Sequence, residues 1–314
     1  MEQMLEQLIS AAGESNVRTM EPMAPHVTFR AGGKADYFVS PEDEKALAAV
    51  VRICREHGMP FYLLGNGSNL LVGDRGYRGV VIHMGDAWSF CDFRGQEVRA
   101  GAGILLSRLA KEACRRELSG LEAAGGIPGT LGGALVMNAG AYGFEMKDVV
   151  RRARLMTEEG KILELSADEL ELGYRRSCIP ERKLIVLEAE LELKTGSREE
   201  ICAAMEDFSA RRREKQPLEY PSAGSTFKRP EGYFAGKLIQ DAGLRGYRVG
   251  GAQVSEKHCG FVINRGGATA GDIMKLCRDV QRTVEERFGV SLELEVRTLG
   301  EFEEPEEGRR PWSW

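Results

Sequence analysis

The sequence predicts an α+β protein with more than one compact part. Its 314 residues suffice for one large domain or for two to three smaller ones. Hydrophobic residues make up 42% and charged residues 29%, which is typical of a globular chain that buries a core. A mixed segment, a mainly strand-forming segment and a helix-rich last third follow one another without an internal repeat.

Charge and cysteine usage narrow the class of protein. The formal net charge of −5 argues against a general nucleic-acid binder, which needs an excess of Lys and Arg. The first ten residues carry acids and no long apolar run, so we expect no targeting peptide there. No stretch of the chain reaches membrane-spanning length without charges, so we expect no membrane span. The seven cysteines are scattered without CxxC spacing, which predicts reduced core thiols rather than disulfides or a metal site. We therefore expect a cytoplasmic protein with no metal and no nucleic-acid or membrane partner. A monomer is the expected state, although neither charge nor cysteine usage determines it.

Residues 1–80 form the first predicted part, a compact βαβ unit preceded by a helix. Ser40 is the expected cap of the second helix, with Pro41 at its first position and Gly58 after its end. The predicted elements are a helix over 1–13, a strand, turn and strand over 28–39, a helix over 41–57 and a strand over 61–64.

Two further parts and a tail complete the chain. Residues 81–197 are mainly strands, and residues 198–300 are mainly helices closed by one strand, while 301–314 lack periodicity and read as a loosely held tail. The predicted strands are 80–84, 98–103, 151–157, 161–165, 184–193 and 292–299, and the predicted helices are 107–118, 197–215, 234–243 and 269–289.

The first glycine-rich loop, residues 65–72, follows an apolar strand. Its sequence GNGSNLLV combines two glycines with Ser and Asn donors, which is typical of a nest of backbone N–H groups that binds phosphate oxygens. It does not match the dinucleotide fingerprint, because Leu70 stands where the third glycine belongs. A plain turn between strands explains this loop about equally well. The candidate cofactor residues are Gly65, Asn66, Gly67, Ser68, Asn69 and Leu70.

The second glycine-rich loop, residues 123–143, is more informative. It holds seven glycines, an extended entry at Ile127–Pro128 and Thr130 as the cap of a short helical turn. A large flat cofactor lying against main chain needs such a backbone, and a glycine-rich corner of a β domain explains it less well. Two phosphate-binding loops in one chain favour a dinucleotide such as FAD. The candidate residues are Gly126, Ile127, Pro128, Gly129, Thr130, Gly132, Gly133, Asn138, Gly140, Ala141 and Gly143.

Six segments now carry a resemblance to a known family. They are, in order, GNGSNLLV, AAGGIPGTLGGALVMNAGAYG, GYRRS, AGSTFKRP, AGKLIQDAGLRGYRVGGAQVSEKH and LELEVR. Together they resemble the UDP-N-acetylenolpyruvoylglucosamine reductase (UDP-N-acetylmuramate dehydrogenase) family over residues 20–300. The resemblance implies a two-part FAD-binding fold of the vanillyl-alcohol-oxidase (PCMH) type plus a C-terminal α+β substrate-binding domain. Because Ser177 lies so close to the strand at Leu184, the chain resembles the shorter branch, which lacks an inserted tyrosine-bearing loop.

The implied activity is a two-step reduction in peptidoglycan precursor synthesis. NADPH reduces bound FAD, and the flavin then passes hydride to the enolpyruvyl ether of UDP-N-acetylglucosamine enolpyruvate, giving UDP-N-acetylmuramate. Hydride addition leaves negative charge next to a carboxylate, so the protein must stabilise that charge and supply a proton.

Three residues match the catalytic positions of the family. Ser225 matches the proton-donating serine, although a serine after glycine is more often a turn residue. Arg175 matches the arginine that meets the carboxylate, and from the residues alone its neighbour Arg176 is an equal candidate. Glu295 matches the catalytic glutamate; Glu293 lies on the same face of the predicted strand, and Leu294 replaces the usual proline.

The resemblance also implies a set of substrate-binding residues. Lys215 and Arg212 match basic residues that approach the substrate, while most of the neighbouring arginines read as a solvated helix face. Arg229 and His258 stand where another branch has asparagine and glutamine near the UDP group. The full set is Tyr174, Arg212, Lys215, Arg229, Arg245 and His258.

Two other functions compete with this hypothesis. The first is an oxidase or dehydrogenase of the same superfamily that acts on a small alcohol, and AGSTFKRP and LELEVR argue against it. The second is a non-catalytic sensor of nucleotide sugars. A yellow protein that NADPH bleaches would exclude the sensor.

Overall fold

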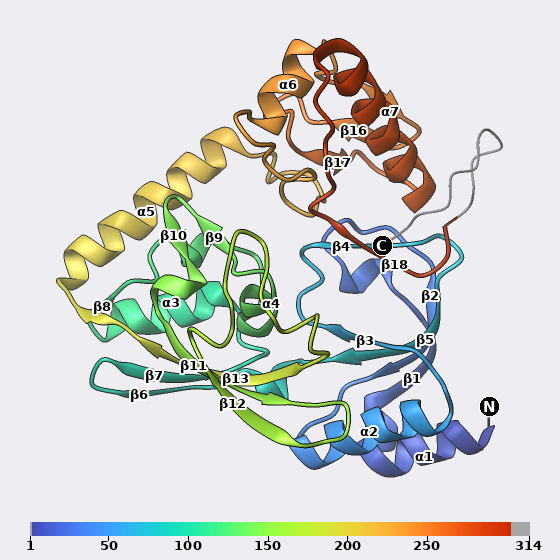
Figure 1. The fold of residues 1–314 in the computed structure, drawn as a ribbon, viewed down its shortest axis with the longest axis vertical. Coiled ribbons are helices and arrows are strands. Elements are labelled where there is room, and N and C mark those ends of the chain that lie inside the picture. Colours follow the sequence, from blue (N-terminus) through green and yellow to red (C-terminus); the bar gives the residue numbers. More distant parts are fainter. Residues whose placement is uncertain (1, 303–314) are drawn as a thin grey trace. The chain divides into compact units, whose positions relative to one another are not determined.

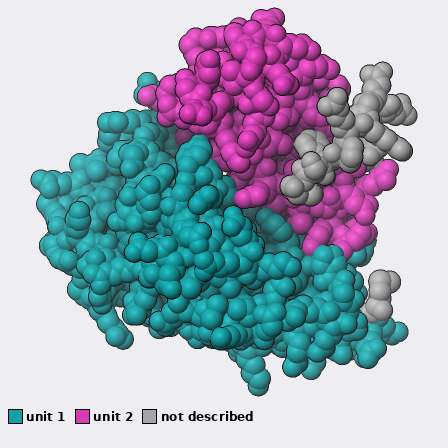
Figure 2. All heavy atoms as spheres, in the orientation of Figure 1, with its two compact units in different colours: residues 1–21, 36–67, 79–214 teal, residues 22–35, 68–78, 215–314 magenta. Residues whose placement is uncertain are grey.

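The structure is a computed structural model that describes residues 2–302. The chain divides into two compact units (Figure 2). The first unit comprises the residues up to 21, 36–67 and 79–214, and the second comprises 22–35, 68–78 and the residues from 215 onward. The three-part division at residues 80 and 197 stays a prediction, and residues 303–314 of the predicted tail lie outside the described residues.

The first unit begins with a small α/β layer. Its four-stranded sheet has the order β1-β2-β5-β3, and β3 and β5 are parallel. Helices α1 and α2 lie side by side, with Leu8 and Leu47 in one buried cluster with Val39 and Val80 (Figure 1). The elements are α1 (Glu2–Ala12), β1 (Val17–Pro22), β2 (Lys34–Val39), α2 (Glu44–Glu56), β3 (Phe61–Leu64) and β5 (Tyr77–His83).

Two local predictions in this layer were wrong. Helix α2 is capped by Asp43, whose side chain accepts a hydrogen bond from Ala46 N at 2.7 Å, and not by Ser40. Pro41 lies outside the helix, where its carbonyl accepts from Trp88 Nε1 at 2.8 Å. The predicted strand at residues 28–30, which belongs to the second unit, is a turn. Strand β1 was not predicted, because VRTMEP does not alternate between apolar and polar residues.

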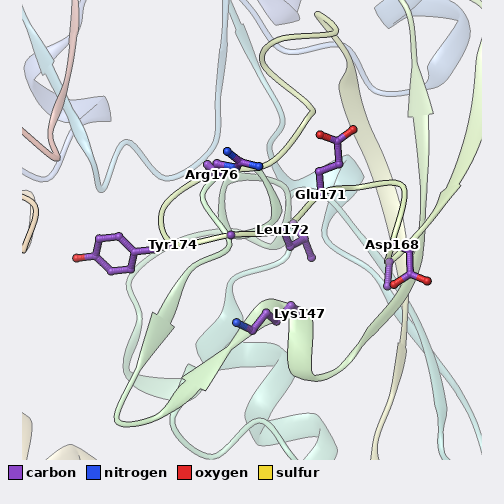
Figure 3. A pocket seen from close by; sticks show the side chains of 8 residues that line it. Lys147, Asp168, Glu171, Leu172, Tyr174 and Arg176 are labelled. Atoms are coloured by element: carbon purple, nitrogen blue, oxygen red, sulfur yellow. The ribbon is translucent and has the colours of Figure 1, made fainter. Parts of the chain in front are cut away.

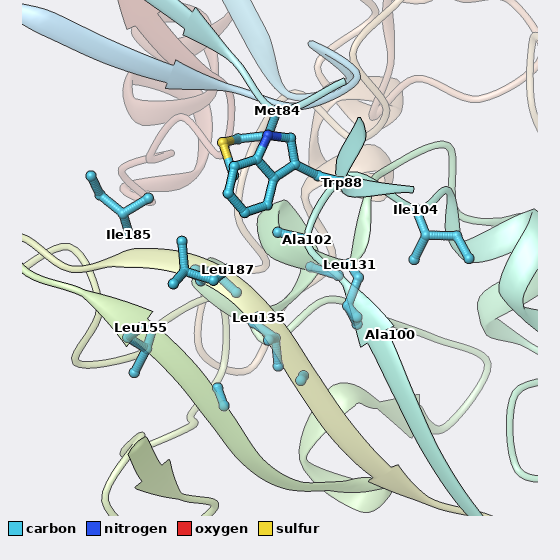
Figure 4. Packing of buried hydrophobic residues seen from close by; sticks show 14 of the residues in the cluster. Met84, Trp88, Ala100, Ala102, Ile104, Leu131, Leu135, Leu155, Ile185 and Leu187 are labelled. Carbon is cyan, nitrogen blue, oxygen red and sulfur yellow. The ribbon is translucent and has the colours of Figure 1, made fainter. Parts of the chain in front are cut away.

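The rest of the first unit is built on an antiparallel five-stranded sheet of order β12-β11-β13-β7-β6. Four of its strands match strands predicted from the sequence, whereas β6 and the order of the sheet were not predicted. Trp88, Leu131, Leu135 and Leu187 are among the buried side chains of its core (Figure 4). Its strands are β6 (Cys91–Arg94), β7 (Glu97–Gly101), β8 (Leu118–Ser119), β9 (Gly140–Ala141), β10 (Phe144–Glu145), β11 (Val150–Met156), β12 (Ile162–Ser166), β13 (Ile185–Glu192) and β14 (Lys194–Thr195), and its helices are α3 (Leu106–Arg115), α4 (Leu131–Val136) and α5 (Arg198–Lys215).

The second unit has a separate core. Helix α7 begins where Thr269 and Asp272 form a capping box and ends at Gly289, which has a left-handed backbone. Asp74 accepts from Ala270 N at 2.8 Å and from Gly271 N at 2.7 Å, which ties residues 68–78 to this helix. The elements are α6 (Ala235–Asp241), α7 (Ala270–Phe288), the sheet of β15 (Arg248–Val249), β16 (Ala252–Val254) and β17 (Val262–Asn264), and the parallel pair β4 (Leu70–Val72) and β18 (Arg297–Leu299).

Short 3-10 helices connect several elements. They lie at Glu14–Asn16, Ala24–His26, Asp86–Trp88, Ala124–Gly126 and Met146–Asp148. Among residues 2–302, no helix has the length and apolar composition needed to cross a membrane.

Candidate active site

The start of the first glycine-rich loop, residues 65–67, contacts the second loop within the first unit. Asn66 Nδ2 donates a hydrogen bond to Pro128 O at 2.5 Å. A Cβ atom at Gly65 would collide with Thr130 Oγ1, so glycine is needed there for this close approach. Residues that are more than sixty positions apart in the sequence therefore lie in contact, as a cofactor site shared by the two loops requires.

Gly133 is a glycine that packing within the protein does not explain. It lies exposed in α4, its φ is not in the positive region, and a Cβ there would meet only Thr130 Oγ1, at an ordinary 3.7 Å. A helical glycine costs about 1 kcal/mol relative to alanine. Gly132 differs, because its added Cβ would lie 3.0 Å from Ala102 Cβ. The open space at Gly133 fits the close approach of a flat ligand.

Gly133→Ala should separate folding from cofactor binding. The new methyl group enters open space and raises helix propensity, so the apoprotein should gain up to about 1 kcal/mol of stability. The same methyl group should hold the flavin away from the backbone and weaken FAD binding by roughly tenfold. Thermal unfolding of the apoprotein and fluorescence titration with FAD measure the two effects.

Gly132→Ala is the matched control, because its methyl group meets Ala102 and should destabilise the apoprotein. Unchanged FAD affinity in Gly133→Ala would contradict the placement of the cofactor at this helix.

Asn138 lies at the end of α4 and faces the protein. Its side chain is fully buried; Nδ2 donates to Glu145 Oε2 at 3.2 Å and to Gly173 O at 3.0 Å, and Oδ1 accepts from Lys147 N at 3.0 Å. The side chain therefore has its donors and acceptor occupied, and its predicted contact with the cofactor stays a prediction. Gly140 and Ala141 form β9, which pairs with β10 across the turn at Gly143.

Arg212 is the arginine of α5 that lies against the second glycine-rich loop. Arg211 and Arg213 are exposed, but Arg212 is half-buried, and a Cβ at Gly126 would lie 3.1 Å from its Nη1. Burial lowers the pKa of the Arg212 guanidinium below its ordinary value. Arg212 therefore lies beside the predicted cofactor loop, and its predicted contact with the substrate stays a prediction.

Arg175 projects from a tight turn. Gly173 N donates to Arg176 O at 3.0 Å, and Arg176 N donates to Gly173 O at 3.2 Å, so Tyr174 and Arg175 form the tip. Arg175 has φ 55, in the left-handed region that costs a side-chain-bearing residue about 1–3 kcal/mol. Its guanidinium lies 4.9 Å from the centre of the Tyr174 ring, and Tyr174 is 51% exposed. Arg30 and Lys183 also have positive φ, so this backbone conformation alone does not make Arg175 functional, and its catalytic role stays a prediction.

Ser225 and Glu295 belong to the second unit, on either side of buried Thr226. Ser225 is exposed, while Thr226 is 1% exposed and accepts from Val262 N through Oγ1 at 2.9 Å. Glu295 N donates to Thr226 O at 2.9 Å, and Asn69 Nδ2 donates to Glu295 O at 3.0 Å. Thr226 therefore anchors the backbone that carries both candidates.

The structure distinguishes the two glutamates that strand alternation left equal. Glu293 pairs with Lys228 at 2.8 Å, its side chain is 74% exposed, and this hydrogen bond lowers the pKa of its carboxyl. Glu295 is half-buried beside Thr226. Residues 293–295 flank a single bridge between Leu294 and Phe227, so the predicted strand over 292–299 is regular only in β18.

The other predicted substrate residues lie in the second unit in different settings. Arg229 is exposed and stacks 4.0 Å from the centre of the Phe234 ring, and Lys215 is exposed at the end of α5. Arg245 donates to Glu256 O and to Gln240 Oε1 at 2.6 Å. His258 Nδ1 accepts from Gly260 N at 3.1 Å, and burial lowers the pKa of its imidazole.

Sequence reasoning missed Thr226 and the structural role of Asn69, both of which fix the backbone around Glu295. Thr226 carried no signal beyond its place after Ser225, and Asn69 was assigned to the cofactor although its amide binds the Glu295 backbone. The hydrogen bond between Asn69 and Glu295 could not be predicted from the sequence, because the two residues lie 226 positions apart.

Comparison with known proteins identifies the family. The FAD binding domain model matches residues 35–166, and the model of the UDP-N-acetylenolpyruvoylglucosamine reductase C-terminal domain matches residues 216–299. The chain is 52% identical over 306 residues to UDP-N-acetylenolpyruvoylglucosamine reductase of Lachnoclostridium phytofermentans, covering 96% of this chain and 98% of that protein. The chain belongs to the UDP-N-acetylenolpyruvoylglucosamine reductase family.

Further matches agree with this membership. The UDP-N-acetylenolpyruvoylglucosamine reductase of Clostridioides difficile is 51% identical over 294 residues, covering 94% of this chain and 97% of that protein. The crystal structure of the Thermus caldophilus reductase matches with a TM-score of 0.78 at 37% identity, over 90% of this chain and 98% of that one. The glucose dehydrogenase Phl p 4.0202 matches 62% of this chain and 44% of that one with a TM-score of 0.50 at 13% identity, a likeness of fold alone.

Membership of the UDP-N-acetylenolpyruvoylglucosamine reductase family confirms several predictions made from the sequence. The chain is an enzyme, a flavin-dependent oxidoreductase of peptidoglycan precursor synthesis, and its cofactor is FAD. The predicted fold class, a PCMH-type FAD-binding fold followed by a C-terminal α+β domain, is also confirmed.

Proposed function

We propose that this enzyme uses NADPH to reduce UDP-N-acetylglucosamine enolpyruvate to UDP-N-acetylmuramate through its FAD. The observation that carries the proposal is the 52% identity over 96% of the chain to a protein named UDP-N-acetylenolpyruvoylglucosamine reductase. The proposal extends to a monomeric cytoplasmic enzyme of the shorter family branch, as the sequence predicts.

The FAD is proposed to lie on the surface where the two glycine-rich loops meet. The contact between the loops involves Gly65, Asn66 and Thr130. Gly133 has no side chain, so a ligand can lie close to the exposed face of α4. Bound there, FAD supplies the hydride-transfer chemistry, since no amino-acid side chain carries a hydride. The protein's own task is to hold the substrate, to stabilise the charge that develops and to deliver a proton.

Arg175 and Ser225 are proposed to divide that task. The Arg175 guanidinium, presented at the tip of a strained turn, suits the planar carboxylate of the enolpyruvyl group and the enolate charge next to it. Ser225 is exposed on a backbone that Thr226 fixes, so its hydroxyl can be aimed at one carbon atom. Glu295, half-buried beside Thr226, is proposed to orient donors or share in the proton transfer.

Cationic residues and His258 of the second unit are proposed to bind the UDP group. Arg229 and Lys215 are exposed, where a diphosphate can reach them, and Arg229 Nε also donates to Tyr233 O at 3.3 Å. Arg245 and His258 already bond to protein groups, which favours a role in shaping the site over direct ion pairing. Tyr174 is proposed to contact the substrate beside Arg175.

The purified protein should be yellow, show a flavin absorption spectrum and release FAD on denaturation. NADPH added without oxygen should bleach the flavin, and the enolpyruvyl substrate should restore the colour within one turnover. Stopped-flow absorbance separates the two half-reactions. Release of FMN alone would overturn the cofactor site. Bleaching without substrate-dependent recovery would favour the superfamily oxidase or dehydrogenase.

A further inference from the structure

We propose that Asn138 is a positioning residue that holds the Arg175 turn in its working place. The inference rests on the proposed function, because it assumes that Arg175 meets the substrate. In this proposal Asn138 holds the turn through hydrogen bonds and does not contact the cofactor directly.

Three hydrogen bonds carry the proposal. Asn138 Nδ2 donates to Gly173 O at 3.0 Å, directly at the base of the turn whose tip is Arg175. The same nitrogen donates to Glu145 Oε2 at 3.2 Å, and Oδ1 accepts from Lys147 N at 3.0 Å. A fully buried amide thus joins three segments of the first unit, 138, 145–147 and 173. A buried amide with each partner satisfied fixes geometry, because each lost bond leaves a buried polar group unpaired.

The backbone explains why an asparagine can occupy this position. Asn138 has φ 42, and Asn138 N donates to Leu135 O at 3.2 Å while Ala139 N donates to Ala134 O at 2.8 Å. These are the two bonds of a Schellman motif, which places its left-handed residue just after the helix, here α4. Glycine satisfies that backbone as well as asparagine does, so the helix end alone does not require an amide.

Two further anchors surround the same turn. Ser177 Oγ donates to Val136 O at 2.9 Å, a second link from α4 to the chain after the turn. Glu145, held by Asn138, also pairs with Lys147 Nζ at 2.6 Å. Lys147 and Gly173, whose backbone groups Asn138 binds, line a hollow together with Asp168, Glu171 and Arg176 (Figure 3). Removal of the amide therefore removes bonds that hold Lys147 and Gly173 in the wall of this hollow.

Asn138→Gly tests the proposal without straining the backbone, since glycine accepts the positive φ. Limited trypsin digestion with mass spectrometry measures the turn directly, because trypsin cleaves after Arg175 and Arg176. Loss of these bonds should accelerate cleavage there by about tenfold in the apoprotein. FAD affinity and flavin reduction by NADPH should stay near the wild-type values, and reoxidation by the enolpyruvyl substrate should slow by about 10–100-fold.

Asn264→Ala is the matched control. Asn264 is also buried, donates to Phe29 O at 2.9 Å and accepts from Gly266 N and Ala268 N, but it lies in the second unit. Its loss should lower thermal stability without faster cleavage after Arg175 or Arg176. A double variant, Asn138→Gly with Arg175→Ala, should be no slower in reoxidation than Arg175→Ala alone, because both changes remove the same contribution.

Several results would overturn the proposal. Unchanged cleavage after Arg175 and Arg176 would show that other bonds hold the turn. Weaker FAD binding with an altered flavin spectrum would show that Asn138 contacts the cofactor, as the sequence predicted. Additive losses in the double variant would mean that Asn138 acts independently of Arg175. Failure of the proposed reaction itself is distinguishable, since wild-type protein would then show no substrate-dependent reoxidation while the digestion result would stand.

Discussion

Ser225→Ala should leave flavin reduction by NADPH close to the wild-type rate and slow reoxidation by the enolpyruvyl substrate by several orders of magnitude. Hydride transfer without protonation stalls at a carbanion-like intermediate, so the loss falls on the second half-reaction alone. The exposed hydroxyl of Ser225 stands next to Thr226, whose three hydrogen bonds fix the local backbone. The alanine variant should therefore fold normally. Stopped-flow absorbance of the flavin, followed in each half-reaction, gives both rates.

Ser222→Ala is a control within the same segment. Ser222 is half-buried and stands three residues before Ser225, outside the proposed machinery. Its loss should leave both half-reactions near the wild-type rates. Equal slowing of both half-reactions in Ser225→Ala would instead make Ser225 a structural residue, and the proton would come from another group.

Regular elements with strong periodic patterns were predictable from the sequence. The long helix over 269–289 carries its own signals in Thr269 and Gly289, and the structure has it as α7 (Ala270–Phe288). The antiparallel strands β11 and β12 match the strands predicted at 151–157 and 161–165, and Gly160 lies in the turn between them. The strands β15, β16 and β17 were missed, because two or three residues are too few to show an alternating pattern.

Contacts between distant segments were not predictable. The second unit includes residues 22–35 and 68–78, and nothing local in those segments indicates that they pack with a helix near residue 270. The cap of α2 was misplaced for a similar reason, since Pro41 is engaged by Trp88, 47 positions away. Local sequence predicts that a helix is present, whereas long-range hydrogen bonds influence which residue caps it, here Asp43 and not Ser40.

The candidate site divides in the same way. Glycine-rich loops indicate a backbone that a ligand can approach closely, and the two loops therefore predicted the correct class of cofactor, a dinucleotide. It did not indicate which glycines serve packing, such as Gly132 against Ala102, and which leave open space, such as Gly133. Nor did it show that Arg175 has a left-handed backbone while Arg176 does not. The family resemblance chose Arg175 over Arg176 as the catalytic candidate, and the positive φ of Arg175 is a structural difference between the two neighbours.

Arg175→Ala and Glu295→Gln should each slow the second half-reaction strongly, while Arg176→Ala and Glu293→Gln should do little. Removing a group that stabilises developing charge typically costs about 10²–10³-fold in rate. Glu293 is already paired with Lys228 in an exposed salt bridge, which contributes little beyond local order. Rates of reoxidation in stopped flow, compared within each pair of neighbours, separate a functional side chain from an adjacent one of the same type.

Arg175→Gly sharpens the test of the arginine. Glycine relieves the positive φ of Arg175, so thermal stability should hold or rise, while reoxidation should be as slow as in Arg175→Ala. A strained arginine whose loss stabilises the fold and abolishes the chemistry is retained for function and not for folding. If Arg175→Gly unfolds the protein, the side chain supports the turn and its assignment to the substrate carboxylate fails. If Glu293→Gln proves the damaging glutamate change, the catalytic carboxylate lies one pleat repeat away from Glu295, and the FAD site is unaffected.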